Sequence, residues 1–261
     1  GGPEKAISDG YIMKLNDLMD GYAPNLKKLL KEYPEADKMI KTDSGDYYVF
    51  PTLKLDSKIT VAYGPIIRAD WLKELKMELP ETMDDWYQML KAFKEQKKAA
   101  APLSYSGKVV LKDSGAFIGA FGVLQNSYVD DGKLKYGPYE QGYKDFITTF
   151  AKWFSEGLID KNIASIDQKG LDAKVLNHET GATLGYNSAA LGRWLQGKKS
   201  ETFDLTPAKY PVMNKGDIPK FAKKDLMYAP YMSVAISAKS KNKELAARYL
   251  DYGFSEEGKT M

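Results

Sequence analysis

Short runs rich in β-branched residues alternate with longer apolar periods of helical spacing along this chain. This alternation restricts the possible folds more than any other feature. Residues 59–63, 182–186 and 232–236 have the composition of strands. Apolar side chains at helical spacing separate them, most clearly from Tyr143 to Phe154. Strands that alternate with helices are typical of α/β proteins, so the sequence predicts an α/β fold.

Local signals set the limits of some of these elements. Thr82 is followed three residues later by Asp85, a variant of the capping box that predicts the start of a helix. Gly64 and Pro65 are expected to end the first strand. The apolar segment from Gly115 to Leu124 contains three glycines, and we predict a buried helix there.

Composition excludes several classes of chemistry. The chain has no cysteine and a single histidine, His178, which rules out disulfides, thiolate chemistry and histidine metal clusters. The 38 basic and 35 acidic side chains are interspersed and leave a net charge of only +3, so we expect no nucleic-acid partner. Helix capping and solvation explain the adjacent carboxylates at 84–85 and 256–257. We therefore nominate no catalytic residue, no metal ligand and no cofactor.

Several segments, in order and spread over nearly the whole chain, resemble the family 1 extracellular solute-binding proteins of bacterial ABC importers. The likeness is greatest to the large lipoprotein members of Gram-positive bacteria. The matching segments are Asp9-Gly10, Leu15 to Leu18, Tyr22 to Leu26, Gly64 to Leu72, Pro80 to Trp86, Trp153 to Asp160, Ala246 to Tyr252 and Ser255 to Gly258.

The resemblance implies a periplasmic-binding-protein fold of the second type, with two lobes joined by crossover strands. Lobe I would comprise residues 1–58 and 237–261, and lobe II residues 64–229. Residues 59–63 would form the first crossover strand and residues 230–236 the return strand. Family members are longer at both ends, so we expect lobe I to be incomplete here.

The resemblance also implies a function. The protein would capture a small polar solute and deliver it to ABC permease subunits in the membrane. A sugar or oligosaccharide is favoured as this solute over a peptide. It would act as a monomer on the cell surface, held by a lipid anchor that this chain does not include, and it would not be an enzyme. Relatives often carry a calcium loop after the helix ending near Lys94. Residues 95–102 instead supply lysines and alanines, so we predict no calcium there.

Ligand contacts in such a fold come from positions after strands and at helix starts. Tyrosines are favoured because a ring offers an apolar face together with a hydrogen-bonding tip. The candidates are Asp56, Ser57, Tyr63, Ser114, Phe117, Tyr186, Asn187, Trp194, Tyr228 and Tyr231.

Two other functions stay open from the residues alone. An extracellular carbohydrate-active hydrolase would need two carboxylates facing each other across a cleft, about 5 to 10 Å apart. A purely structural surface domain would have its cleft filled by apolar side chains. The alternating pattern and the tyrosine-rich loops favour binding over both.

Overall fold

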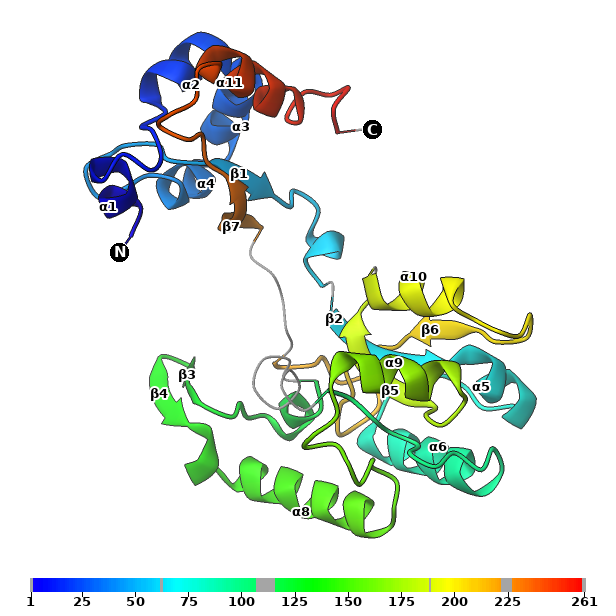
Figure 1. Ribbon diagram of the computed structural model, residues 1–261. Helices are drawn as coiled ribbons and strands as arrows, with labels where there is room; N and C mark the ends of the chain where they lie inside the picture. The colour runs from blue at the N-terminus through cyan, green and yellow to red at the C-terminus, as the bar shows by residue number, and fades with distance from the viewer. Residues whose placement is uncertain (1, 62, 107–115, 188, 222–226, 260–261) are drawn as a thin grey trace. The chain divides into compact units, whose positions relative to one another are not determined.

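The computed structural model describes residues 2–61, 63–106, 116–187, 189–221 and 227–259, with only the backbone at residue 57 and at residues 228–232. The chain forms two compact units. Unit 1 comprises Gly1–Thr60 and Leu226–Met261, and unit 2 comprises Val61–Asp225. Figure 1 labels the helices and strands of both. No helix in the described residues has the length and apolar character that a bilayer crossing needs.

Unit 1 is mainly helical and contains one small sheet. Strands β1 and β7 pair antiparallel, with an irregularity in the register between Phe50 and Thr52. The core consists of buried apolar residues from α2, α3 and α11, joined by side chains such as Ile40 and Ile236. The elements are α1 (Pro3–Ser8), α2 (Asn16–Tyr22), α3 (Pro24–Glu32), α4 (Pro34–Met39), β1 (Phe50–Leu53), the 3-10 turn η1 (Ser57–Thr60), β7 (Tyr228–Val234) and α11 (Lys243–Tyr252).

A buried carboxylate ties the two ends of unit 1 together. Asp251, on α11, accepts hydrogen bonds from the backbone N–H groups of Asn25 at 3.2 Å and Leu26 at 2.8 Å. The Asn25 side-chain amide adds a third at 2.8 Å. These N–H groups belong to the first turn of α3, where backbone donors have no partner within the helix. A residue more than 220 positions away therefore caps this helix.

Unit 2 contains a three-stranded antiparallel sheet in the order β5-β2-β6, and a separate hairpin of β3 and β4. The hairpin turns at Asp131, which has a positive φ, followed by Gly132. The elements are β2 (Tyr63–Arg68), α5 (Ala69–Leu75), α6 (Met83–Glu95), η2 (Ile118–Phe121), β3 (Ser127–Asp130), β4 (Lys133–Tyr136), η3 (Gly137–Tyr139), α8 (Gln141–Ser155), α9 (Gln168–Leu176), β5 (Ala182–Tyr186), α10 (Ala189–Gln196) and β6 (Leu205–Pro207).

The central strand of unit 2 is buried on both faces. Every residue of β2 is buried, and successive side chains point to opposite sides of the sheet. Ile67 packs into the larger core, which includes residues of α5, α6 and α8. Ile66 packs into a second core with residues of α9 and α10. Unit 2 is thus a layered α/β structure, with α6 and α10 on opposite sides of the sheet in Figure 1.

The predicted helix signals at two places are confirmed. Thr82 Oγ1 accepts from the N–H of Asp85 at 3.1 Å, and the Asp85 carboxylate accepts from the N–H of Thr82 at 2.8 Å. This reciprocal pair is the predicted capping box, and α6 begins directly after it. The apolar period from Tyr143 to Phe154 lies within α8.

The predicted strand over residues 59–63 is wrong. Ser57–Thr60 forms the turn η1, and β2 starts only at Tyr63. The Asp56 carbonyl accepts from the N–H of Ile59 at 3.1 Å, and its side chain accepts from the N–H of Lys58 at 2.8 Å. An aspartate that bonds its own downstream backbone closes a turn, and here this outweighs the β-branched composition.

Gly64 and Pro65 do not end the strand either, since both lie inside β2. The register places Pro65 opposite Ala208, just beyond the end of β6, and the Ala208 N–H donates to the Pro65 carbonyl at 2.9 Å. Only the reciprocal hydrogen bond is lost, from the nitrogen of residue 65 to the Ala208 carbonyl, because proline has no N–H. A proline is tolerated in this central strand because its missing donor faces a point where the neighbouring strand has ended.

Two further predictions need correction. The helix expected from Gly115 to Leu124 is wrong: within the described part of this segment only η2 is helical, and it is a 3-10 turn that ends at Gly122 with φ of 71°. The return strand expected over residues 230–236 is shifted, because β7 spans Tyr228–Val234. Ile236 follows the strand as a buried core residue, and its carbonyl accepts from Met13.

Candidate ligand-binding site

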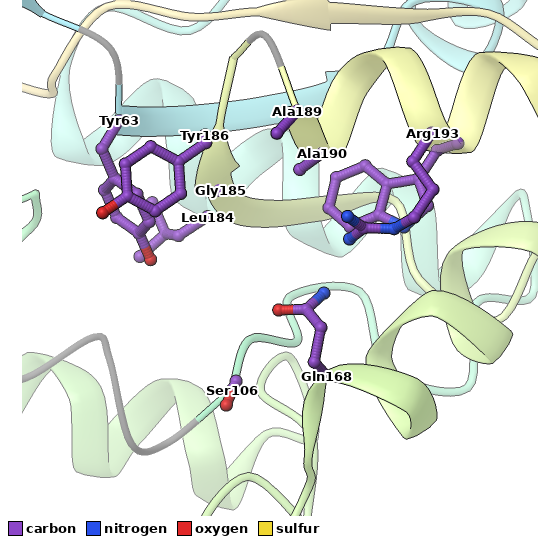
Figure 2. Close-up of a pocket in the computed structure, with 10 residues that line it drawn as sticks. Tyr63, Ser106, Gln168, Leu184, Gly185, Tyr186, Ala189, Ala190 and Arg193 are labelled. Atoms are coloured by element: carbon purple, nitrogen blue, oxygen red, sulfur yellow. The ribbon is translucent and has the colours of Figure 1, made fainter. Parts of the chain in front are cut away.

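A cavity of about 140 Å³ opens in unit 2 where β2 starts, β5 ends and α10 begins. This volume is smaller than the roughly 300 Å³ or more of a site that encloses a whole small ligand. The cavity therefore fits part of a ligand. Figure 2 shows its walls. They are formed by Tyr63, Ser106, Gln168, Leu184, Gly185, Tyr186, Ala189, Ala190, Arg193 and Trp194.

Two tyrosines on neighbouring strands form one end of the cavity. Tyr63 and Tyr186 face each other in the antiparallel register, and their rings meet edge to face with centroids 5.1 Å apart. Tyr63 is only 4% exposed, and its carbonyl accepts from the Tyr210 hydroxyl at 2.5 Å. Tyr186 is 45% exposed. The buried ring supports the exposed one, which can present an apolar face to a ligand (Figure 2).

Polar side chains at the other end are held by one carboxylate. Asp172, on α9, accepts from Arg193 Nε at 3.1 Å and from Arg193 Nη2 at 2.9 Å. It also accepts from Gln168 Nε2 and from Trp194 Nε1, both at 2.8 Å. One side chain thus fixes three residues of the cavity wall, from two different helices.

The same contacts decide the charge of Asp172. Its partial burial alone would raise the pKa of this carboxyl. The hydrogen bonds from Arg193, Gln168 and Trp194 and the charge of the guanidinium outweigh that effect and hold the pKa below its usual range. Asp172 is therefore ionised at neutral pH, and it forms a charge-assisted bidentate pair with Arg193.

A glycine lets α10 lie close to the sheet. A Cβ on Gly185 would come within 3.1 Å of Ala190 Cβ and 3.4 Å of Ile66 Cδ1. The small side chains at positions 185 and 190 bring the start of α10 against β5. This packing places Arg193 and Trp194, one turn further along α10, at the cavity.

The cavity combines a half-exposed ring, an amide, a hydroxyl and a guanidinium. Such groups bind a polar solute by stacking and hydrogen bonding. Among the described residues, no three or more histidine, cysteine, aspartate and glutamate side chains gather closely enough to hold a metal ion. The described lining residues include no aspartate or glutamate, so they do not supply the pair of carboxylates that a glycosidase needs.

The sequence candidates have different positions in the structure. Tyr63, Tyr186 and Trp194 line the cavity, although Trp194 is fully buried and contributes to its wall and not to an exposed surface. Asn187 lies in the turn after β5, and its buried Oδ1 has no hydrogen-bond partner among the described residues. Phe117 belongs to the core, where it contacts Trp86, Phe150 and Trp153 edge to face.

The remaining candidates are not among the described residues that line this cavity. Asp56 is exposed in the residues before η1, in unit 1, and the backbone of Ser57 starts that turn. Tyr228 and Tyr231 lie on β7, also in unit 1, where only the backbone is described. Ser114 lies outside the described residues. All of them stay predictions.

Sequence reasoning missed three polar residues of the wall. Gln168 is the first residue of α9, and the expectation that ligand contacts lie at helix starts could have identified it. Ser106 follows a short buried segment that is neither a helix nor a strand, and no sequence signal marks it. Arg193 lies inside a helix, and its pairing with a carboxylate on a different helix holds its side chain at the cavity. No local pattern signals that pairing.

The profile of the family described as bacterial extracellular solute-binding protein matches residues 3–260. The chain belongs to this family. The predicted family resemblance is therefore confirmed. The fold class is confirmed too, by the crystal structure of the alginate-binding protein AlgQ2 without calcium ion. That structure superposes on this solute-binding protein with a TM-score of 0.71 at 28% identity, over 97% of this chain and 53% of that one.

Two curated relatives are similar in sequence. The fructooligosaccharide ABC transporter substrate-binding protein FusA of Streptococcus pneumoniae serotype 4 (strain ATCC BAA-334 / TIGR4) is 27% identical over 257 residues, which are 93% of this chain and 46% of FusA. Lipoprotein LipO of Bacillus subtilis (strain 168) is 33% identical over 196 residues, 71% of this chain and 37% of LipO. This solute-binding protein thus spans about half the length, or less, of the curated relatives it matches.

Proposed function

We propose that this chain belongs to the solute-binding component of an ABC importer and that its ligand is an oligosaccharide. The observation that carries the proposal is the cavity of unit 2, where the half-exposed ring of Tyr186 lies opposite the hydrogen-bonding groups of Gln168 and Arg193. Sugars present both apolar faces and hydroxyl groups, and this combination of ring and polar groups matches both. The name of FusA, a fructooligosaccharide-binding relative, supports the same class.

In this proposal the two units are the two lobes. Unit 1 corresponds to lobe I and unit 2 to lobe II, and a solute that contacts both favours a closed form. The protein binds without changing the ligand, acts outside the cell as a monomer, and passes the solute to permease subunits. The relatives' descriptions as a substrate-binding protein and a lipoprotein support this placement.

Calorimetric titration with a fructooligosaccharide series tests the proposal. We expect saturable binding, and Tyr186→Ala is expected to weaken it about tenfold, because a stacked ring contributes on the order of 1 kcal/mol. Tyr139→Ala is the matched control, since Tyr139 is 88% exposed on η3 and does not line the cavity. Equal affinities in both variants would remove Tyr186 from the site. Conversion of the sugar into products would exclude a pure binding function.

A further inference from the structure

The cavity is lined by the guanidinium of Arg193, whose charge is balanced by Asp172, a residue outside the described lining. Among the described lining residues, Arg193 is the one with a formal charge. Its side chain is 47% exposed, and its guanidinium is held by Asp172, which is 26% exposed. The bond is bidentate, through Nε and Nη2. The pair as a whole is neutral, so the cavity presents donors without net charge.

The pair also determines which donors reach a ligand. A guanidinium has N–H groups on three nitrogens in a fixed plane, and Asp172 occupies the edge formed by Nε and Nη2. The N–H groups of Nη1 and the second N–H of Nη2 point elsewhere, and they can donate to hydroxyl oxygens. A ligand carboxylate can reach the remaining edge of Nη1 and Nη2, but it would meet a guanidinium whose charge Asp172 already balances, so it gains less there than at an unpaired arginine.

We infer that Asp172 sets the ligand class of this cavity, so that it accepts neutral oligosaccharides and discriminates against oligouronates. The inference rests on the proposed function, because it specifies which saccharide the same site binds. Asp172 acts as a positioning residue: it lies beside the cavity wall and acts through Arg193, Gln168 and Trp194.

The test compares two probes of equal length, a neutral fructooligosaccharide and an oligogalacturonate, by titration calorimetry at low and high salt. The unaltered protein is expected to bind the neutral probe at least tenfold more tightly. Asp172→Asn keeps the shape but leaves the Arg193 charge uncompensated. Oligogalacturonate affinity should then rise roughly tenfold at low salt, and the gain should disappear near 1 M salt, where the screening length falls to about 3 Å.

Two further variants separate charge from structure. The double variant Asp172→Asn with Arg193→Gln removes both charges, so the weak oligogalacturonate binding of the unaltered protein should return. Asp145→Asn is the matched control. It removes the charge from an equivalent Gln141–Asp145 bond of 2.7 Å on α8 and changes the net charge equally, at a residue outside the described cavity lining. It should leave the ratio of the two affinities unchanged.

The outcomes are distinct. A preference for the neutral probe that Asp172→Asn reduces, and that the double variant restores, supports the inference. Equal or tighter binding of oligogalacturonate by the unaltered protein overturns the inference and leaves the proposed function in place. An affinity ratio that Asp172→Asn does not change overturns it as well. If neither saccharide binds, the proposed function fails, and the inference fails with it.

Discussion

Gly181 lies where unit 2 has no room for a side chain. It precedes β5, and its carbonyl accepts from the N–H of Arg68 at 2.9 Å. A Cβ here would overlap Phe93 Cδ2 and come within 2.8 Å of Trp71 Cζ3. Those two rings already pack edge to face at 5.2 Å. Neither can move without disturbing the larger core, because both belong to it.

We therefore predict that Gly181→Ala destabilises unit 2 by about 2 kcal/mol or more, in the range expected for overpacking. Gly192→Ala serves as the control, because it lies inside α10 with no atom within 4 Å of its added Cβ. Alanine there should stabilise the helix by about 0.5 to 1 kcal/mol. Urea unfolding curves measure both changes. A neutral Gly181→Ala would show that the two rings repack freely.

A buried carboxylate contributes to the pH dependence of the stability of unit 2. Asp160 is only 3% exposed. It accepts from Ser104 Oγ at 2.6 Å and from the Asn162 N–H at 2.9 Å, and Lys174 Nζ lies at 3.2 Å. Burial alone would raise its pKa. The hydrogen bonds from Ser104 and Asn162 and the Lys174 ammonium outweigh burial and hold the pKa below the usual range.

The sign of the effect follows from this lowered pKa. The folded chain holds the Asp160 proton less tightly than the unfolded chain, whose aspartates titrate near 3.9. The ionised group therefore contributes stability above about pH 4, and that contribution is lost as the pH falls toward the folded pKa. We predict that Asp160→Asn costs about 2 kcal/mol at pH 7 and clearly less at pH 3. A cost that stays constant between these pH values would contradict the assignment.

At the scale of elements, the helices α6 and α8 and the strand β5 could be predicted, but the limits of β2 and β7 and the 3-10 turn η2 could not. The helices α6 and α8 carry their information locally, in a capping box and in a wide apolar face. The start of β2 depends instead on the turn at Asp56, and its passage through Pro65 depends on where β6 ends. Sequence composition records neither: the first is a local turn that outweighs the β-branched residues, and the second is set by pairing with a distant segment.

The candidate site shows the same division. Tyr63 was expected at the end of a strand over residues 59–63, but it begins β2, where it pairs with Tyr186. Tyr186 was predictable, since it is the last residue of β5 and the fold class places ligand contacts there. Arg193 was not, because Asp172 on the preceding helix holds its side chain at the cavity. Phe117 was assigned to the site for its position, and the structure places it among aromatic core residues. From the sequence alone, an aromatic side chain after a loop can be either a ligand contact or a core residue, and only its neighbours in the structure distinguish the two.

The two units have no strand in common among the described residues, and the chain passes between them at residues 60–61 and 225–226. All four tryptophans, Trp71, Trp86, Trp153 and Trp194, belong to unit 2. Tryptophan fluorescence therefore reports the unfolding of unit 2, whereas far-ultraviolet circular dichroism reports the helices of both units. The two methods together can distinguish two separate transitions from one cooperative transition.

Asp251→Asn in unit 1 provides that test, because the amide cannot accept all three hydrogen bonds that now cap α3. We predict a loss of about 2 kcal/mol, seen as an earlier phase in the circular dichroism curve, while the tryptophan transition stays in place. Gly181→Ala should do the reverse and move the tryptophan transition, since its clash lies in unit 2. If Asp251→Asn moved both signals equally, the units would unfold as one body. The stability of each could then not be assigned to its own core.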